Sequence, residues 1–141
     1  MVTESGKTNN VLVVFDFDGT LVFDDGSHED FDVVRELLKL GVETAIASRN
    51  DKYHVQRQLT VLGISELFRY VMADFRPKSY QMKHILWLFS RRNVEFSRVY
   101  FVDDYTPNID RMKSDLREVI NLQYGKDIEL LWNLIPIVTA K

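Results

Sequence analysis

Buried strands and amphipathic helices alternate along this chain. Five short runs are rich in β-branched and aromatic residues, as strands buried on both faces are: 11–15, 42–47, 70–73, 98–102 and 118–122. Between and after these runs, apolar residues recur at intervals of three and four, which is typical of a helix with one buried face. This second pattern predicts helices around residues 31–38, 55–62, 85–89 and 127–135.

Strands that alternate with helices predict βαβ units with right-handed crossovers. We therefore expect an open, doubly wound (Rossmann-like) α/β fold, with a mostly parallel sheet of about five strands and helices on both faces. No repeat, low-complexity tract or linker interrupts the pattern, so residues 11–141 are interpreted as a single domain. Residues 1–10 are polar and are expected to form a flexible leader.

Composition and charge narrow the class of protein. The chain has 141 residues, 45% hydrophobic and 28% charged, which is typical of a soluble globular domain. It has no cysteine, which excludes disulfides, thiolate zinc sites and a cysteine nucleophile. The net charge is −3 with both signs interspersed, so no nucleic-acid surface is indicated. No apolar run approaches the ~18 residues of a membrane span, and the leader lacks a signal peptide's apolar stretch, so we expect a cytoplasmic protein.

Polar side chains follow four of the predicted strands. In strand order they are Asp16 and Asp18, then Ser48 and Arg49, then Lys78, and finally Asp103 and Asp104. Because ligands of open α/β sheets bind beyond the carboxyl ends of the strands, we expect these side chains to meet at one edge.

The chemistry of this set indicates phosphate and a hard cation. Carboxylates from two strands repel each other unless a cation lies between them, and Mg²⁺ prefers such oxygen ligands. A lysine and a hydroxyl can hold the remaining phosphate oxygens. A carboxylate such as Asp16 can also attack phosphorus, which splits one displacement into two easier ones. Asp18 points the same way as Asp16, so it can act as general acid and then activate water, and Gly19 permits a sharp turn beside them.

These residues carry a resemblance to a known family. Asp16-Phe17-Asp18-Gly19-Thr20-Leu21 after a buried strand resembles the first motif of the haloacid dehalogenase (HAD) superfamily of aspartate-nucleophile phosphotransferases. Ser48, Lys78 and Asp103-Asp104 stand in the order of its second, third and fourth motifs. Residues 47–49 and 77–104 are similar to the small magnesium-dependent phosphatases of that superfamily and their relatives. The resemblance covers residues 11–122.

The resemblance implies roles for the acids. Asp16 would be the nucleophile and a metal ligand, and Asp18 the general acid/base, whose backbone carbonyl also reaches Mg²⁺. Asp103 would hold the metal. Asp104 would lie next to the ligands or bind the metal through water.

The resemblance also implies roles for the other polar residues. Ser48 would bind the phosphate, Arg49 would contact the substrate, and Lys78 would neutralise the phosphate and the nucleophile. Lys83 competes with Lys78 for this last role. We prefer Lys78 because Ser79 is interpreted as a helix N-cap, which puts Lys78 at the mouth of the site, whereas Lys83 lies about a turn inside the helix.

The spacing of the motifs leaves no room for an inserted cap domain. Only about ten residues separate Thr20 from Phe31, and one helix and one strand use up the chain between Ser48 and Lys78. An open site suits a protruding or bulky substrate. We therefore expect a Mg²⁺-dependent phosphomonoester hydrolase with an aspartyl-phosphate intermediate, acting on a phosphorylated small molecule such as a bulky sugar phosphate, or on phosphotyrosine or another phosphoprotein side chain.

Two alternatives from other classes stay open. One is a HAD-like transferase, or a relative that binds phosphorylated groups without hydrolysis. The other is a receiver-type phosphoacceptor switch, which is disfavoured because a receiver has its acceptor acid after the third strand, where this chain has Lys78. The pattern gives no prediction of oligomeric state.

Other polar residues are interpreted as structural. Asp24-Asp25-Gly26-Ser27 has the composition of a turn that leads into a helix, with a role in admitting substrate as the alternative. His28, His54 and His84 share no metal-ligand spacing and are interpreted as surface or half-buried residues. Tyr105, beside the fourth-strand acids, is a candidate for lining the mouth of the site.

Overall fold

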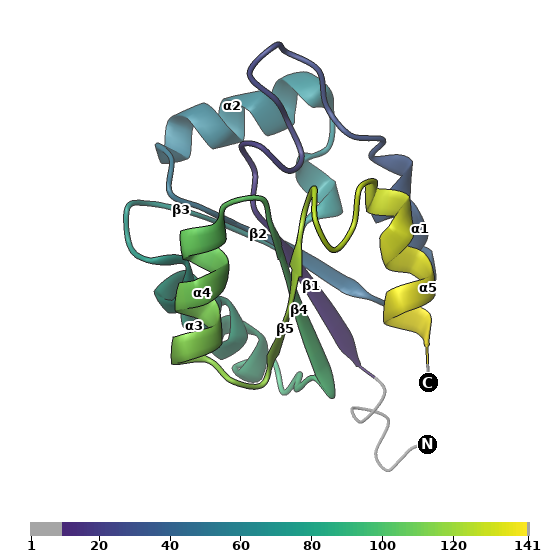
Figure 1. Ribbon diagram of the computed structural model, residues 1–141, viewed down its shortest axis with the longest axis vertical. Helices are drawn as coiled ribbons and strands as arrows, with labels where there is room; N and C mark the ends of the chain where they lie inside the picture. The colour runs from purple at the N-terminus through teal and green to yellow at the C-terminus, as the bar shows by residue number, and fades with distance from the viewer. Residues whose placement is uncertain (1–9, 141) are drawn as a thin grey trace.

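The computed structural model describes residues 10–140 and has a five-stranded, wholly parallel sheet between two layers of helices (Figure 1). The strands are β1 (Val11–Phe15), β2 (Glu43–Ser48), β3 (Tyr70–Ala73), β4 (Arg98–Asp103) and β5 (Val119–Gln123). Their order across the sheet is β3-β2-β1-β4-β5. The predicted fold class is confirmed, with β2 and β5 starting and ending one residue later than the pattern indicated.

The central strand β1 separates two apolar cores. Val13 and Phe15 face one core, and Leu12 and Val14 face the other, because successive side chains of a strand point to opposite faces. This explains why β1 reads as an unbroken apolar run. The helices are α1 (Asp32–Lys39), α2 (Lys52–Leu62), α3 (Lys78–Ser90), α4 (Thr106–Asp115) and α5 (Leu134–Thr139), with short 3₁₀ turns η2 (Ser65–Leu67) and η3 (Leu131–Asn133). α1, α2 and α5 cover the first core, and α3 and α4 cover the second (Figure 1).

The last predicted helix is wrong in its position. Residues 127–130 form a turn, a single-residue bridge from Ile128 to Tyr124 and a bend, and α5 begins only at Leu134, after η3. Tertiary and local side-chain contacts take the backbone groups that a helix would use: the amide of Leu131 donates to the Glu29 carboxylate at 3.2 Å, and the amide of Leu130 donates to Asn133 Oδ1 at 3.0 Å. Pro136 falls in the first turn of α5, where its missing N–H costs nothing.

Two further sequence expectations concern the ends of the chain and membranes. The polar leader expected at 1–10 lies, apart from Asn10, outside the described residues. Among the helices of residues 10–140, none combines the length and the apolar character needed to cross a bilayer.

Candidate active site

The candidate site lies where the order of the strands reverses: β2 and β3 extend the sheet on one side of β1, and β4 and β5 extend it on the other. β1 and β4 are neighbours, but the chain leaves β1 toward the α1 layer and leaves β4 toward the α4 layer. Such a divergence opens a crevice at the carboxyl ends of the strands. Asp16 follows β1 directly and Asp103 ends β4, while the amide of Asp16 donates to the carbonyl of Val102 at 2.8 Å. The ladder between the two strands therefore fixes these acids side by side.

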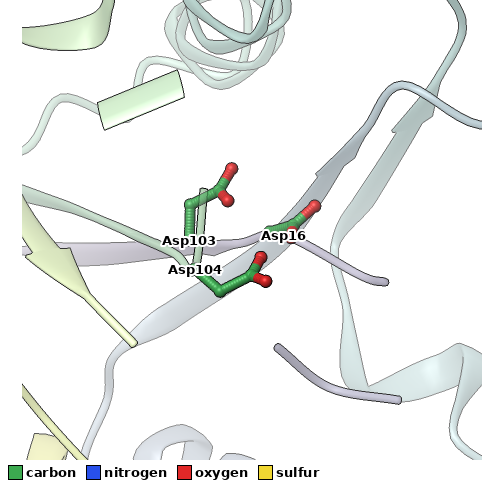
Figure 2. A group of neighbouring side chains, drawn as sticks. All are labelled: Asp16, Asp103 and Asp104. Carbon is green, nitrogen blue, oxygen red and sulfur yellow. The ribbon is translucent and has the colours of Figure 1, made fainter. Parts of the chain in front are cut away.

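Three carboxylates gather at this point (Figure 2). Asp16, Asp103 and Asp104 each offer one oxygen, and these oxygens lie within 4.8 Å of one another. Asp16 is 7% exposed and Asp103 is fully buried, whereas Asp104 is exposed. Such close carboxylates are a set that could hold a metal ion.

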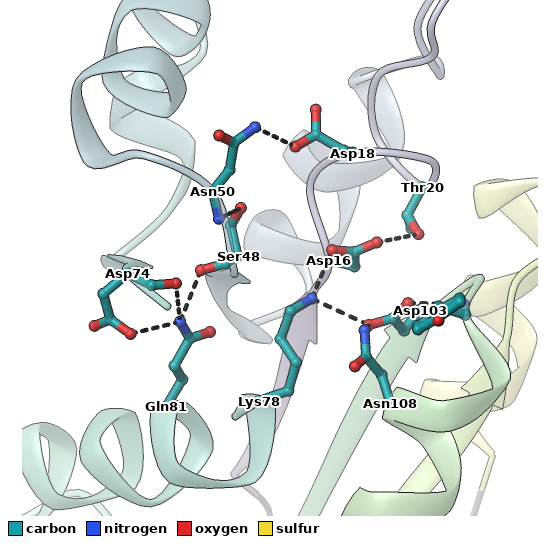
Figure 3. Close-up of polar contacts among 11 residues, drawn as sticks. Asp16, Asp18, Thr20, Ser48, Asn50, Asp74, Lys78, Gln81, Asp103 and Asn108 are labelled. Carbon is teal, nitrogen blue, oxygen red and sulfur yellow. Dashed lines mark hydrogen bonds and ion pairs between the residues drawn. The ribbon is translucent and has the colours of Figure 1, made fainter. Parts of the chain in front are cut away.

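Lys78 joins two of these acids (Figure 3). Its Nζ lies 2.6 Å from Asp16 Oδ1 and 3.1 Å from Asp103 Oδ2, and its side chain is nearly inaccessible to solvent. The ammonium group of Lys83 instead lies over the ring of Tyr80, 5.4 Å from its centroid. Of the two lysines that the sequence left in competition, the structure thus brings Lys78 to the acids.

The interpretation of Ser79 as a helix N-cap, on which the preference for Lys78 rested, is wrong. Ser79 is not an N-cap: α3 begins at Lys78 itself, preceded by Pro77. The Ser79 hydroxyl is buried and donates to Asp115 of α4 at 2.6 Å, so it joins two helices. Lys78 is held at the mouth of the site because it opens the helix, not because a capping residue follows it.

Further donors orient the carboxylates (Figure 3). Asp103 accepts a hydrogen bond from the Tyr105 amide at 2.9 Å and one from Asn108 Nδ2 at 3.0 Å. Asp16 accepts one from the Thr20 hydroxyl at 3.3 Å. Each buried acid is therefore fixed in one orientation, as a preorganised site requires.

Burial disfavours the charged form of the Asp16 carboxyl. It raises the pKa of Asp16 to about 8, with the negative charge of Asp103 adding to the rise and the ammonium of Lys78 opposing it. Partial burial and the charge of Asp103 likewise raise the pKa of Asp104. The cluster therefore holds more negative charge than one lysine neutralises.

The charge of the cluster matches a divalent cation. With all groups ionised, three carboxylates and one ammonium leave two negative charges in a largely buried space. The donors are hard oxygens, and none of the described residues in the cluster is a histidine or cysteine. This composition fits Mg²⁺ better than zinc or copper.

Gly19 leaves room for the Asp104 carboxylate because it has no side chain. The residue has φ +86°, and a Cβ built on it would lie 2.5 Å from Asp104 Oδ2. A side chain here would both strain the backbone and push the carboxylate away. The glycine of the first motif is thus required by a close approach as well as by the turn.

Replacing Gly19 with alanine should lower the free energy of unfolding by about 1–2 kcal/mol and weaken Mg²⁺ binding. Urea unfolding and calorimetric titration with Mg²⁺ measure the two effects. Gly26→Ala is the matched control, because Gly26 has φ +88° and nothing within 4 Å of its built Cβ. Equal Mg²⁺ affinity in the two variants would contradict the proposed effect on Asp104.

Asp18 lies on the far side of the site from Asp103 and does not belong to the carboxylate cluster. Its exposed carboxylate accepts a hydrogen bond from Asn50 Nδ2 at 2.8 Å, and the amide of Asn50 donates to Ser48 Oγ at 3.2 Å (Figure 3). Asn50 therefore links the loop after β1 to the end of β2.

A cavity of about 320 Å³ connects these groups. It is lined by Asp16, Asp18, Ser48, Arg49, Asn50, Lys78, Asp104, Tyr105 and Asn108. Six of the seven residues that the sequence singled out line it, and the seventh, Asp103, is fully buried. The Arg49 side chain also donates from Nε to the carbonyl of Phe75 at 3.3 Å, which ties it to the loop after β3.

Sequence reasoning missed three polar residues that hold the site together. Asn50 and Asn108 make the contacts described above, and each had a weak signal, since Asn50 is two residues after Ser48 and Asn108 is one helical turn after Asp104. Gln81 gave no signal. It is fully buried, and its Nε2 donates to the carbonyl of Ser48 at 2.7 Å and to Asp74 Oδ1 at 2.9 Å (Figure 3).

Solved phosphatase structures share this architecture. The chain is 16% identical to the core domain of a putative phosphoglycolate phosphatase from Streptococcus pneumoniae, with a TM-score of 0.68 over 94% of this chain and 97% of that one. It is 18% identical to 3-deoxy-D-manno-octulosonate 8-phosphate phosphatase from Moraxella catarrhalis, solved with magnesium, phosphate and KDO, with a TM-score of 0.52 over 89% and 73% of the two chains. The chain has the haloacid dehalogenase fold.

A third structure with the HAD fold is the N-terminal part of a Bacteroides fragilis protein that contains a phosphatase domain, in complex with Mg. Identity is 15% and the TM-score 0.65 over 82% of this chain, which spans only 36% of that one. No family model and no curated protein matches the sequence. The resemblance read from the motifs is therefore confirmed at the level of the HAD fold.

The HAD fold is present here without an inserted cap. Within residues 10–140, the segment between Thr20 and α1 is a short loop closed by a bridge between Val22 and His28. The segment between Ser48 and Lys78 contains α2, η2 and β3 and no further element. Neither of these two segments therefore covers the cavity beside Asp16 with an additional domain.

Proposed function

We propose that this chain is a Mg²⁺-dependent phosphomonoesterase that acts through a phosphorylated Asp16. One observation carries the proposal: Asp16 contacts the ammonium of Lys78 and belongs to a cluster of three carboxylates that could hold a metal ion, at the wall of a cavity that Asp18 also lines. Solved phosphatase structures with the same fold support the proposal.

Asp16, Asp103 and Asp104 are the residues that would hold Mg²⁺. The ion would neutralise phosphate charge and polarise the phosphorus for attack. Lys78 adds a positive charge that two of these carboxylates share. Ser48 and Arg49 line the same cavity and supply a hydroxyl and a guanidinium for the phosphate oxygens and the substrate.

In the first step, an oxygen of Asp16 attacks phosphorus. A new bond forms between that oxygen and phosphorus, and the bond from phosphorus to the ester oxygen breaks. Asp18 gives its proton to the departing ester oxygen, which leaves as an alcohol. The hydrogen bond from Asn50 orients the Asp18 carboxyl for this transfer.

In the second step, water attacks the phosphorus of phospho-Asp16. Asp18, now ionised, accepts a proton from this water, and the bond between phosphorus and the Asp16 oxygen breaks. Inorganic phosphate leaves, and both carboxyl groups return to their starting states. Lys78 stabilises the regenerated Asp16 carboxylate through the contact at 2.6 Å.

The absence of a cap within residues 10–140 bears on the substrate. Tyr105 is 59% exposed and lines the cavity beside the acids, so a substrate can enter across a wide mouth. Bulky sugar phosphates and phosphorylated protein side chains, phosphotyrosine included, are the substrates that such a mouth admits.

Phosphate release should require Mg²⁺, and the apparent affinity for Mg²⁺ should rise between pH 6 and pH 8. Burial and Asp103 raise the pKa of Asp16 to about 8 in the ion-free protein, against the opposing charge of Lys78. A proton must therefore leave before the carboxylate can bind the ion, and this costs more as the pH falls. Phosphate release is measured from p-nitrophenyl phosphate and acetyl phosphate over a Mg²⁺ titration at three pH values, with EDTA as the blank.

Calorimetry in two buffers of different ionisation enthalpy then counts the protons that Mg²⁺ releases. Turnover that persists in EDTA would contradict the proposed function. Affinity for Mg²⁺ that is independent of pH would contradict the protonation of Asp16 while leaving the enzymatic proposal standing.

A further inference from the structure

A second cavity adjoins the first, and we propose that it holds the leaving group of the substrate, a neutral, hydroxyl-rich group the size of one sugar or polyol. This inference rests on the proposed phosphatase function and narrows its substrates to sugar or polyol monophosphates. It also favours a small molecule over a phosphorylated protein side chain.

The second cavity lies between the loop after β1 and helix α2. It has a volume of about 310 Å³, and its walls include Asp24 and His28 from the loop and His54 and Gln58 from α2. Figure 1 shows this loop beside α2, at the end of the molecule where β1 ends. Asp18 lines both this cavity and the one that contains Asp16 and Lys78.

The shared residue gives the two cavities complementary roles. The phosphoryl group must lie beside Asp16 and Lys78, in the first cavity. Asp18, as the acid, must lie within hydrogen-bond reach of the ester oxygen that departs. The atoms that follow this oxygen can therefore extend past Asp18 into the second cavity.

The polar residues of the second cavity are suited to hydroxyl groups, while Val22, Phe23 and Leu62 form the apolar part of its lining. His28 Nδ1 lies 2.8 Å from the carbonyl of Glu29, and because a carbonyl only accepts, Nδ1 is the donor of this contact. In a neutral imidazole with this tautomer, Nε2 is an acceptor. Asp24 adds further acceptor atoms, and the Gln58 amide offers both donors and acceptors.

The charge of the lining argues against an anionic leaving group. Of the described residues that line the second cavity, none is a lysine or arginine, whereas Asp18 and Asp24 are acidic. A second phosphate or a carboxylate would be repelled by these acids, with no lysine or arginine of the lining to offset the repulsion. A volume of about 310 Å³ is also at the lower end for small-molecule pockets, ~300–1,000 Å³, which suits a single sugar unit.

The loop after β1, which forms one wall of the second cavity, is held in place by hydrogen bonds to distant parts of the chain and within the loop itself. The buried Glu29 carboxylate accepts hydrogen bonds from the Tyr124 hydroxyl and from the amide of Leu131. Within the loop, the amide of Phe23 donates to the carbonyl of Ser27 at 2.9 Å. A wall held in this way is formed before the ligand arrives, so binding spends little free energy on ordering it.

The test compares three kinds of substrate with the 141-residue protein and Mg²⁺. They are a panel of neutral hexose, pentose and polyol monophosphates, acetyl phosphate, and a phosphotyrosine peptide. We expect the best member of the panel to exceed both other substrates in kcat/KM by about tenfold or more, the effect of one or two hydrogen bonds.

Gln58→Trp fills the cavity and Gln58→Ala removes an amide, and each should lower the ratio of kcat/KM between that sugar phosphate and acetyl phosphate by about tenfold. Arg57→Ala is the matched control, since Arg57 is an exposed neighbour on α2 outside the lining. Thermal unfolding shows that each variant folds. An unchanged ratio in both Gln58 variants, or a preference for the peptide, overturns the inference and leaves the phosphatase proposal intact. No Mg²⁺-dependent release from any substrate overturns both.

Discussion

Replacing Asp16 with asparagine should lower phosphate release from p-nitrophenyl phosphate by ~10³-fold or more. An amide is a poor nucleophile, so phosphorus can no longer be transferred to residue 16. The variant should still fold, because asparagine has nearly the same volume and relieves the repulsion between Asp16 and Asp103. The measurement is steady-state kcat/KM with saturating Mg²⁺.

A direct readout accompanies the rate. Wild-type protein quenched with acid during turnover should carry phosphate on the peptide that contains Asp16, and the variant should not. Asp110→Asn is the matched control, because Asp110 is an exposed acid on α4 that lines neither cavity. Full activity of Asp16→Asn, or phosphate on another residue, would refute the nucleophilic role.

Replacing Lys78 with methionine should destabilise the ion-free protein by ~3 kcal/mol or more. The Lys78 ammonium contacts two buried acids at 2.6 and 3.1 Å, and methionine leaves these acids without a neighbouring positive charge. Turnover should fall to background as well, because the same ammonium neutralises the phosphate and the nucleophile. Urea unfolding in EDTA and a Mg²⁺-dependent assay measure the two effects.

The loss of stability should depend on pH and on Mg²⁺ in a defined direction. Without the opposing charge of Lys78, the pKa of Asp16 rises further above its unfolded value, so the folded state binds more protons than the unfolded state. The penalty is then largest at high pH and shrinks as the pH falls. Mg²⁺ should also reduce it. Lys83→Met removes an exposed lysine from the same helix, and equal stability of the two variants in EDTA would contradict the role given to Lys78.

The sheet could be predicted from the sequence because its strands are buried on both faces. β1 packs against a core on each side, so every position must be apolar and the run is unbroken. A strand of this kind contrasts sharply with the charged residues that follow it. For the same reason Asp16 and Asp103 could be assigned to the ends of two strands, and parallel strands place such ends at one edge.

The start of α5 could not be predicted, because it depends on contacts between distant parts of the chain. The residues around 127–135 have a helical pattern, but Glu29, about a hundred residues earlier, takes the amide of Leu131. The role of Gln81 has the same origin. Its sequence neighbours give no sign that its amide will lie 2.7 Å from the carbonyl of Ser48, since only the packing of α3 on β2 brings the two together.

By itself, the sequence determined the five strands, the helices α1, α2 and α3, and the identity of the acids and the lysine at the strand ends, because burial and backbone conformation impose local patterns on the chain. Only the tertiary structure decided which lysine lies between Asp16 and Asp103, which amides orient the acids, and that a second cavity opens beside Asp18. Those features depend on distances between residues far apart in the chain. Such distances follow from how the helices pack on the sheet, and no local pattern records them.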